Sequence, residues 1–245
     1  FTNLNPFSDA PFWHLGFLAV PVTIIWIVGI TNAVNLIDGL DGLAVGVSSI
    51  AAITMLAVAL LTDNMAIAIT MAALTGACIG FMPYNLNPAK IFMGDTGSTF
   101  LGYMLATVSI MGLFKFYAVI SFAVPFLILG LPIFDTANAI IRRLAEGRSP
   151  MSPDRGHVHH KLIDMGFNQK QAVAILYAIS ATLGLTAVVL TSSGEVKAVV
   201  LLAAVLAAIL VGACIIYGAE HWGKHPQEQK KHKKEAAQEE KNKHE

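Results

Sequence analysis

Long apolar runs alternate with short polar stretches along most of this chain. Seven such runs contain no charged residue, and several are long enough to cross a bilayer core of about 30 Å as a helix. The runs cover residues 16–31, 43–62, 65–83, 97–114, 116–134, 171–191 and 198–218. None shows the alternation typical of a membrane β-barrel strand, so the sequence predicts an all-α, polytopic transmembrane helical bundle of about seven membrane helices.

The composition favours the same class of protein. The chain is 55% hydrophobic and only 13% charged, whereas soluble domains carry about 25% charged residues. Its mean hydropathy is +0.63. Cys78 and Cys214 both fall inside predicted spans, where we expect small packing residues rather than a disulfide or a metal site.

The positive charges predict how the bundle is oriented. Fourteen of the sixteen Lys and Arg residues fall at Lys90, within 142–170 or after residue 223. Threading the seven runs through a membrane places these three regions on one side, which the positive-inside rule makes cytoplasmic. We therefore expect a multi-pass membrane protein with its functional loops in the cytoplasm.

Two regions are expected along the chain. Residues 1–219 form the predicted integral membrane domain, and residues 220–245 form a charged tail that we expect to be disordered or a frayed helix. The chain begins at Phe1 without an initiator Met or a signal-peptide pattern, so we expect an N-terminally truncated fragment of a longer protein.

The first predicted cytoplasmic connection carries the most informative polar motif, Asn32-Ala-Val-Asn35-Leu-Ile-Asp38-Gly-Leu-Asp41-Gly. Carboxylates beside membrane spans are costly and usually functional, although a solvated loop is the plain alternative. Glycine lets the backbone turn tightly and approach a ligand. Asp38 and Asp41 can accept hydrogen bonds from a sugar or a base, or help to bind a hard cation.

The second connection contains Phe92-Met-Gly-Asp95-Thr-Gly-Ser98 directly before a predicted helix. A carboxylate there suits Mg²⁺, which proteins hold with one or two carboxylates and substrate phosphates. Capping of the helix by Thr96 or Ser98 is the alternative. Phe92 is either a platform for a nucleobase or an apolar anchor.

The third feature is Asp135 at the inner end of the fifth run, with Arg142 seven residues further on the same helix face. These two residues form either a structural ion pair or a group that positions a substrate or a metal.

The fourth feature is a run that contains Asp154, Arg155 and the cluster His157-Val-His159-His160. The cluster can ligate Zn²⁺, or its cationic donors can bind a diphosphate. The neighbouring prolines and glycine favour a structured loop over a helix.

Other functional classes fit less well. The sequence lacks a His-Glu-x-x-His motif, a P-loop, a dinucleotide Gly-x-Gly-x-x-Gly and a Gly-x-Ser-x-Gly. An ion-coupled transporter is the main alternative, but it should place polar groups near the bilayer midplane rather than at one end of the helices. A zinc-dependent membrane hydrolase would need a further ligand and a base.

The four motifs, taken in this order, resemble the polyprenyl-phosphate N-acetylhexosamine-1-phosphate transferase family (glycosyltransferase 4 type) over roughly residues 17–191. The His-x-His-His cluster after Asp-Arg is most similar to the branch that uses UDP-GlcNAc. The final span and the tail resemble the enzyme that initiates teichoic acid synthesis.

The resemblance implies transfer of GlcNAc-1-phosphate from UDP-GlcNAc to undecaprenyl phosphate, with release of UMP. It implies dependence on Mg²⁺, with Mn²⁺ as a candidate substitute. Membrane lipid is an expected partner, nucleic acid is not, and a homodimer is a candidate assembly. The resemblance gives catalytic roles to Asp38, Asp41, Asp95 and His159, with Asp95 as the metal ligand. It gives substrate-binding roles to Asn32, Asn35, Asn85, Phe92, Asp135, Arg155, His157 and His160.

One departure from the family pattern affects activity. Family members carry an adjacent Asp-Asp pair on an earlier helix, and no Asp-Asp occurs in this sequence. We therefore expect this chain to be inactive alone, even if its nucleotide site forms.

Overall fold

A computed structural model of the chain describes residues 3–4, 13–14, 16–112, 118–149, 152 and 156–192. The predicted run 198–218 and the predicted boundary at residues 219 and 220 lie outside this part. Two-residue strands β1 (Asn3–Leu4) and β2 (Trp13–His14) pair antiparallel and precede a short 3-10 helix, η1 (Gly16–Leu18). The rest of the described structure is helical, which confirms the predicted fold class.

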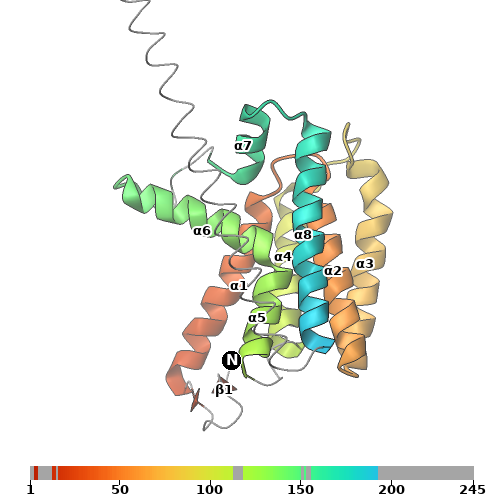
Figure 1. The fold of residues 1–245 in the computed structure, drawn as a ribbon, viewed down its shortest axis with the longest axis vertical. Coiled ribbons are helices and arrows are strands. Elements are labelled where there is room, and N and C mark those ends of the chain that lie inside the picture. Colours follow the sequence, from red (N-terminus) through yellow and green to blue (C-terminus); the bar gives the residue numbers. More distant parts are fainter. Residues whose placement is uncertain are drawn as a thin grey trace, which may run out of the picture. The chain divides into compact units, whose positions relative to one another are not determined.

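The α-helices follow one another with short connections (Figure 1). They are α1 (Ala19–Leu36), α2 (Leu43–Leu61), α3 (Met65–Asn85), α4 (Gly94–Gly112), α5 (Ala118–Ile128), α6 (Gly130–Ala145), α7 (Val158–Asp164) and α8 (Gln169–Ser192).

Within the described residues, four helical segments are long and apolar enough to span a membrane, which confirms a polytopic membrane protein. These segments are Gly16–Leu36, Leu43–Leu61, Met65–Asn85 and Gln169–Ser192. The first extends beyond the predicted end at residue 31, so Asn32 and Asn35 lie on α1 rather than in a loop. Helix α4 begins three residues before the predicted run, with a polar first turn.

The prediction of one continuous span over residues 116–134 is wrong. Helix α5 ends at Ile128, and α6 begins at Gly130 and runs away from the bundle to the side (Figure 1). Pro132 explains the break, because proline has no N–H to continue the helical ladder and its ring clashes with the carbonyl four residues earlier, which is that of Ile128 at the end of α5. At the third position of α6 the missing N–H costs nothing, since the first turn of a helix has no internal acceptor for it.

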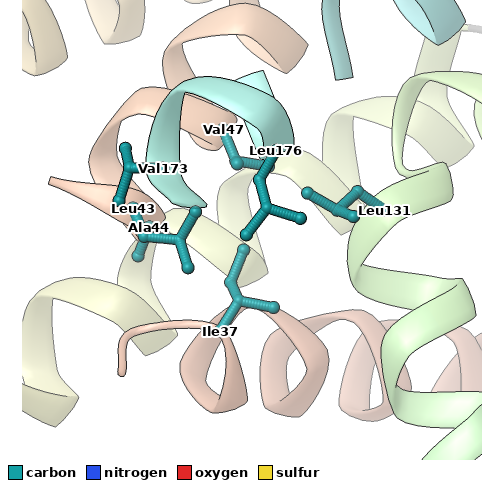
Figure 2. Packing of buried hydrophobic residues seen from close by; sticks show 7 residues of the cluster. All are labelled: Ile37, Leu43, Ala44, Val47, Leu131, Val173 and Leu176. Atoms are coloured by element: carbon teal, nitrogen blue, oxygen red, sulfur yellow. The ribbon is translucent and has the colours of Figure 1, made fainter. Parts of the chain in front are cut away.

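Helix α2 is the centre of the bundle and packs against both α3 and α8. Its first turns are buried on every side, from Leu43 to Ser49. A cluster of buried apolar side chains forms around this end of α2 (Figure 2). Its members are Ile37, Leu43, Ala44, Val47, Leu131, Val173 and Leu176. Because Ile37 and Leu43 flank residues 38–42, the cluster anchors both ends of the first polar connection.

Candidate active site

The motif-bearing segments lie at one end of the helices, as the alternating topology predicts. The α1–α2 connection, the α3–α4 connection and α7 all occur at this end (Figure 1). A hydrogen bond joins the α1–α2 connection to the α3–α4 connection, and His159 of α7 packs against Gly39 in the α1–α2 connection. The segments therefore form one site rather than separate loops.

Asp38 and Asp95 form the carboxylate pair of this site. Asp38 lies in the α1–α2 connection and is partly buried, while Asp95 is exposed in the first turn of α4. Burial raises the pKa of Asp38, and the negative charge of Asp95 raises it further. The two carboxylates are thus close enough to repel one another, an arrangement that a cation would relieve.

Asp41 holds the α3–α4 connection in place. Its Oδ2 accepts hydrogen bonds from Asn87 Nδ2 at 3.0 Å and from the Ala89 backbone N–H at 3.1 Å. Asn87 Nδ2 also donates to Gln169 Oε1 on α8, at 2.9 Å. We call Asp41, Asn87 and Gln169 the loop latch, because they join both connections to the start of α8.

The two asparagines on α1 have different partners. Asn35 Oδ1 accepts a hydrogen bond from Ser98 Oγ at 2.5 Å, which ties α1 to α4 beside Asp95. Ser98 lies inside the first turns of α4, so the alternative in which Thr96 or Ser98 caps the helix is wrong. Asn32 is exposed and donates to the carbonyl of Val28 on its own helix, at 2.7 Å.

The α3–α4 connection presents one buried amide and one exposed ring. Asn85 is 3% exposed and donates from Nδ2 to the Ile91 carbonyl, whereas its buried Oδ1 has no hydrogen-bond partner. A buried acceptor without a partner is costly and calls for a donor. Phe92 is 75% exposed, so its ring is accessible for stacking.

Asp135 lies on α6, and its buried carboxylate binds the start of α7. Oδ2 is 2.8 Å from His157 Nδ1, and Oδ1 accepts the Val158 backbone N–H at 2.8 Å. The expectation that the histidine cluster lies in a loop is wrong, because α7 begins at Val158 and contains His159 and His160. Asp135 supplies the polar cap that lets this short helix start directly after a glycine and proline-rich segment.

His159 closes the site over the α1–α2 connection. Its ring is buried and stacks near His157 and His160, with centroid separations of 5.7 and 4.3 Å. An added Cβ on Gly39 would lie 2.4 Å from His159 Nε2, so only glycine fits there without displacement. Burial lowers the pKa of His159 to about 4, with a further contribution from neighbouring His160, so the ring is neutral near pH 7.

Tyr177 is a supporting residue that the sequence did not reveal. Its Oη donates to the Gly42 carbonyl at 2.5 Å, and its ring occupies the space where a Cβ of Gly46 would be. The sequence indicates this contact only weakly, because a glycine such as Gly46 in a membrane helix indicates close packing but not which residue packs against it.

Arg155 and Arg142 are the two arginines that the sequence motifs singled out. Arg155 lies outside the described residues. The guanidinium of Arg142, on α6, packs against Gly156, directly before His157.

The residues present fit a magnesium ion better than a zinc ion. Within the described part of the chain, no group of three or more His, Cys, Asp or Glu residues could hold a metal. Zinc needs three or four such ligands, whereas Mg²⁺ keeps several waters and uses one or two carboxylates with substrate phosphates. The repelling pair Asp38 and Asp95 supplies such a donor set.

Comparison with known proteins places the chain among membrane transferases. Residues 1–113 match the family model of glycosyl transferase family 4. A Bacillus subtilis (strain 168) protein described as a probable undecaprenyl-phosphate N-acetylglucosaminyl 1-phosphate transferase is 44% identical over 191 residues, covering 76% of this chain and 53% of that protein.

Two further relatives are also named as transferases. The decaprenyl-phosphate N-acetylglucosaminephosphotransferase of Mycolicibacterium smegmatis is 39% identical over 181 residues, covering 65% of this chain and 44% of that protein. The phospho-N-acetylmuramoyl-pentapeptide-transferase of Clostridium beijerinckii is 35% identical over 186 residues, covering 74% of this chain and 54% of that protein. The chain spans about half the length of the curated relatives it matches. These similarities and the ordered motifs show that the chain belongs to glycosyl transferase family 4, among the polyprenyl-phosphate hexosamine-1-phosphate transferases.

Proposed function

We propose that the protein containing this chain transfers GlcNAc-1-phosphate from UDP-GlcNAc to undecaprenyl phosphate. An oxygen of the lipid phosphate becomes bonded to the β-phosphorus of UDP-GlcNAc, and UMP leaves with the bridging oxygen. The product, undecaprenyl-diphospho-GlcNAc, would start a cell-wall polymer such as teichoic acid. The observation that carries the proposal is the carboxylate pair Asp38 and Asp95, with His159 of α7 packed against Gly39 next to Asp38.

The sugar and the lipid are supported by relatives as well as by the motif. The B. subtilis relative, named for undecaprenyl phosphate and N-acetylglucosamine, is 44% identical, against 35% for the C. beijerinckii relative that is named for a muramoyl-pentapeptide. The interrupted cluster His157-Val-His159-His160 agrees with the first of these.

The chemistry suits these residues. Phosphoryl transfer needs alignment and charge neutralisation more than covalent help from the protein. Asp95 and Asp38 would hold Mg²⁺, which when bound would neutralise charge on the donor diphosphate. Because His159 is neutral near pH 7, it can hydrogen-bond to the donor without changing the charge of the site.

The α3–α4 connection is suited to the nucleoside. Phe92 offers an exposed ring on which the uracil can stack, and the unpartnered Oδ1 of Asn85 can accept a hydrogen bond from an N–H of the base. Arg155 and His160 would add donors for the diphosphate. The loop latch would keep Phe92 and Asn85 at a fixed distance from Asp38.

A product assay tests the proposal. The complete gene product that contains this chain would be supplied with UDP-GlcNAc labelled in the β-phosphate, undecaprenyl phosphate and Mg²⁺. The proposal predicts that label enters a solvent-extractable lipid while UMP is released in equal amount. Transfer from UDP-MurNAc-pentapeptide but not from UDP-GlcNAc would show that the proposed sugar is wrong. Absence of lipid product with every UDP-sugar, from folded protein, would refute the transferase proposal.

A further inference from the structure

Both oxygens of the buried Asp135 carboxylate already have hydrogen-bond partners within the protein, which does not suit a direct contact with substrate. Its side chain is 3% exposed, and its partner His157 is 5% exposed. Oδ2 contacts His157 Nδ1 and Oδ1 contacts the Val158 N–H, each at 2.8 Å. Both contacts are of the length expected for strong, charge-assisted hydrogen bonds.

These contacts determine the hydrogen on one ring nitrogen of His157. A carboxylate oxygen only accepts, so Nδ1 must be the donor and must carry the hydrogen. This holds whether the ring is neutral or protonated. In the neutral ring, Nε2 on the opposite edge is therefore the nitrogen that accepts a hydrogen bond.

The same carboxylate also determines where α7 begins. Val158 is the first residue of α7, and His159, the next residue, packs its Nε2 against Gly39. Asp135 on α6 therefore links the break between α5 and α6 to the wall of the carboxylate site. Moving Asp135 would move His159 relative to Asp38.

We propose that Asp135 is a positioning residue for the transferase reaction. It holds His157 with Nδ1 as the donor, leaves Nε2 as the acceptor of the neutral ring, and fixes α7 over Gly39. This assignment rests on the proposed function, and it differs from a direct contact between Asp135 and substrate. Its role resembles that of the carboxylates that orient histidines in hydrolytic and metal sites.

Asp135→Asn is expected to keep one of the two hydrogen bonds of this residue and to remove the other. The amide oxygen can still accept from Val158, so the start of α7 is preserved. The amide nitrogen cannot accept from Nδ1–H, so His157 must switch to the form with hydrogen on Nε2. We expect an unchanged thermal midpoint, a kcat lowered by about 10- to 100-fold, and a KM for the nucleotide sugar within about twofold of wild type.

The experiment uses the complete gene product labelled with ¹⁵N-histidine in detergent. Ring ¹⁵N shifts distinguish a protonated from an unprotonated nitrogen, and the signals of His157 are assigned by their loss in His157→Asn. We expect Nδ1–H in wild type and Nε2–H in Asp135→Asn. Asp164→Asn, an exposed carboxylate at the other end of α7, is the matched control and should change neither the ring signals nor kcat.

His157→Asn is a second test of the proposal. The amide N–H of the new side chain can replace Nδ1–H as the donor to Asp135, but this side chain has no counterpart of Nε2. This variant should fold and lose kcat by a similar factor. In the double variant, the added Asp135→Asn substitution should lower kcat no further. The proposal is overturned if wild-type His157 carries its hydrogen on Nε2, if folded Asp135→Asn keeps wild-type kcat, or if the two substitutions act additively. Inactive wild-type protein would instead refute the proposed function, and the ring signals would still report the positioning.

Discussion

At the residue scale, the contact between Gly39 and His159 is the most sensitive point of the site. A Cβ on Gly39 would meet both Nε2 and Cε1 of His159, at 2.4 and 2.9 Å. Because His159 is buried and stacked between two other histidines, it cannot swing away freely.

We therefore predict that Gly39→Ala lowers the transfer rate by about tenfold or more, since a shift of about 1 Å in a site can cost about 100-fold. The control is Gly76→Ala on α3, where an added Cβ meets nothing within 4 Å. Steady-state rates of both variants, purified in the same detergent, check this. Equal rates would mean that His159 has room to move and that the contact is not tight.

His159 also predicts how stability depends on pH. Its pKa is lowered from 6.5 to about 4 in the folded protein, so the unfolded chain binds more protons between these values. Stability from this residue is complete above about pH 6.5 and is lost as the pH falls toward 4. The thermal midpoint should decrease over this window, and the decrease should be smaller in His159→Gln. An identical pH profile in the variant would contradict the lowered pKa.

Asp95 carries the sharpest prediction about catalysis. Asp95→Asn keeps the size of the side chain but removes the charge that the metal needs, so we expect transfer to fall by about 100-fold or more with little change in folding. Asp63→Asn, in the α2–α3 connection at the opposite end of the bundle, is the control and should remain active. Near-normal turnover in Asp95→Asn would remove this residue from the metal role.

At the element scale, the loop latch joins two connections to α8 and makes their geometry interdependent. Gln169→Ala removes one acceptor of Asn87 and leaves Asp41 as its remaining partner, so the α3–α4 connection should loosen. We predict a severalfold higher KM for the nucleotide sugar with a smaller change in kcat, since the nucleoside-binding residues lie on that connection.

The matched control for the latch is Gln171→Ala, two residues further along α8. Gln171 exchanges hydrogen bonds with Asn168 at the start of α8 and has no part in the latch. This control should cost about 1 kcal/mol of stability without raising KM. An equal rise in KM in both variants would mean that the start of α8, rather than the latch, determines affinity.

The sequence predicted the helices whose bounds follow from hydrophobicity alone, and it missed those whose bounds depend on a local break or a cap. The charge-free runs predicted α2, α3 and α8 closely. The break at Leu129 was missed because residues 116–134 carry no charge, and Gly130 and Pro132 beside the break are also tolerated within membrane helices. Helix α7 was missed because its start depends on a cap from Asp135, which is distant in sequence.

At the scale of the whole molecule, the polar chemistry is concentrated at one end of an apolar bundle. The ordered motifs predicted this convergence, because antiparallel spans return alternate connections to the same side. The partners within the site could not be predicted, since Asp41 finds Asn87, 46 residues away, only through packing. Asp41, expected to be catalytic, and Asp135, expected to bind substrate, both hydrogen-bond to distant parts of the protein, and the sequence did not indicate these partners.

The distribution of positive charge along the chain also predicts which side of the membrane the site faces. If the positive-inside rule orients the bundle correctly, the site faces the cytoplasm. Inside-out membrane vesicles should then use added UDP-GlcNAc at once, while sealed right-side-out vesicles should need permeabilisation. The reverse pattern would place the motif-bearing end on the outer side of the membrane.

The most direct test of the transferase is isotope exchange between UMP and UDP-GlcNAc. Membranes containing the complete gene product would receive labelled UMP, UDP-GlcNAc and undecaprenyl phosphate, with and without Mg²⁺. We predict that label enters UDP-GlcNAc only when both the lipid phosphate and Mg²⁺ are present, and that Asp95→Asn removes this exchange. Well-folded wild-type protein that exchanges label with no UDP-sugar would contradict the proposed function.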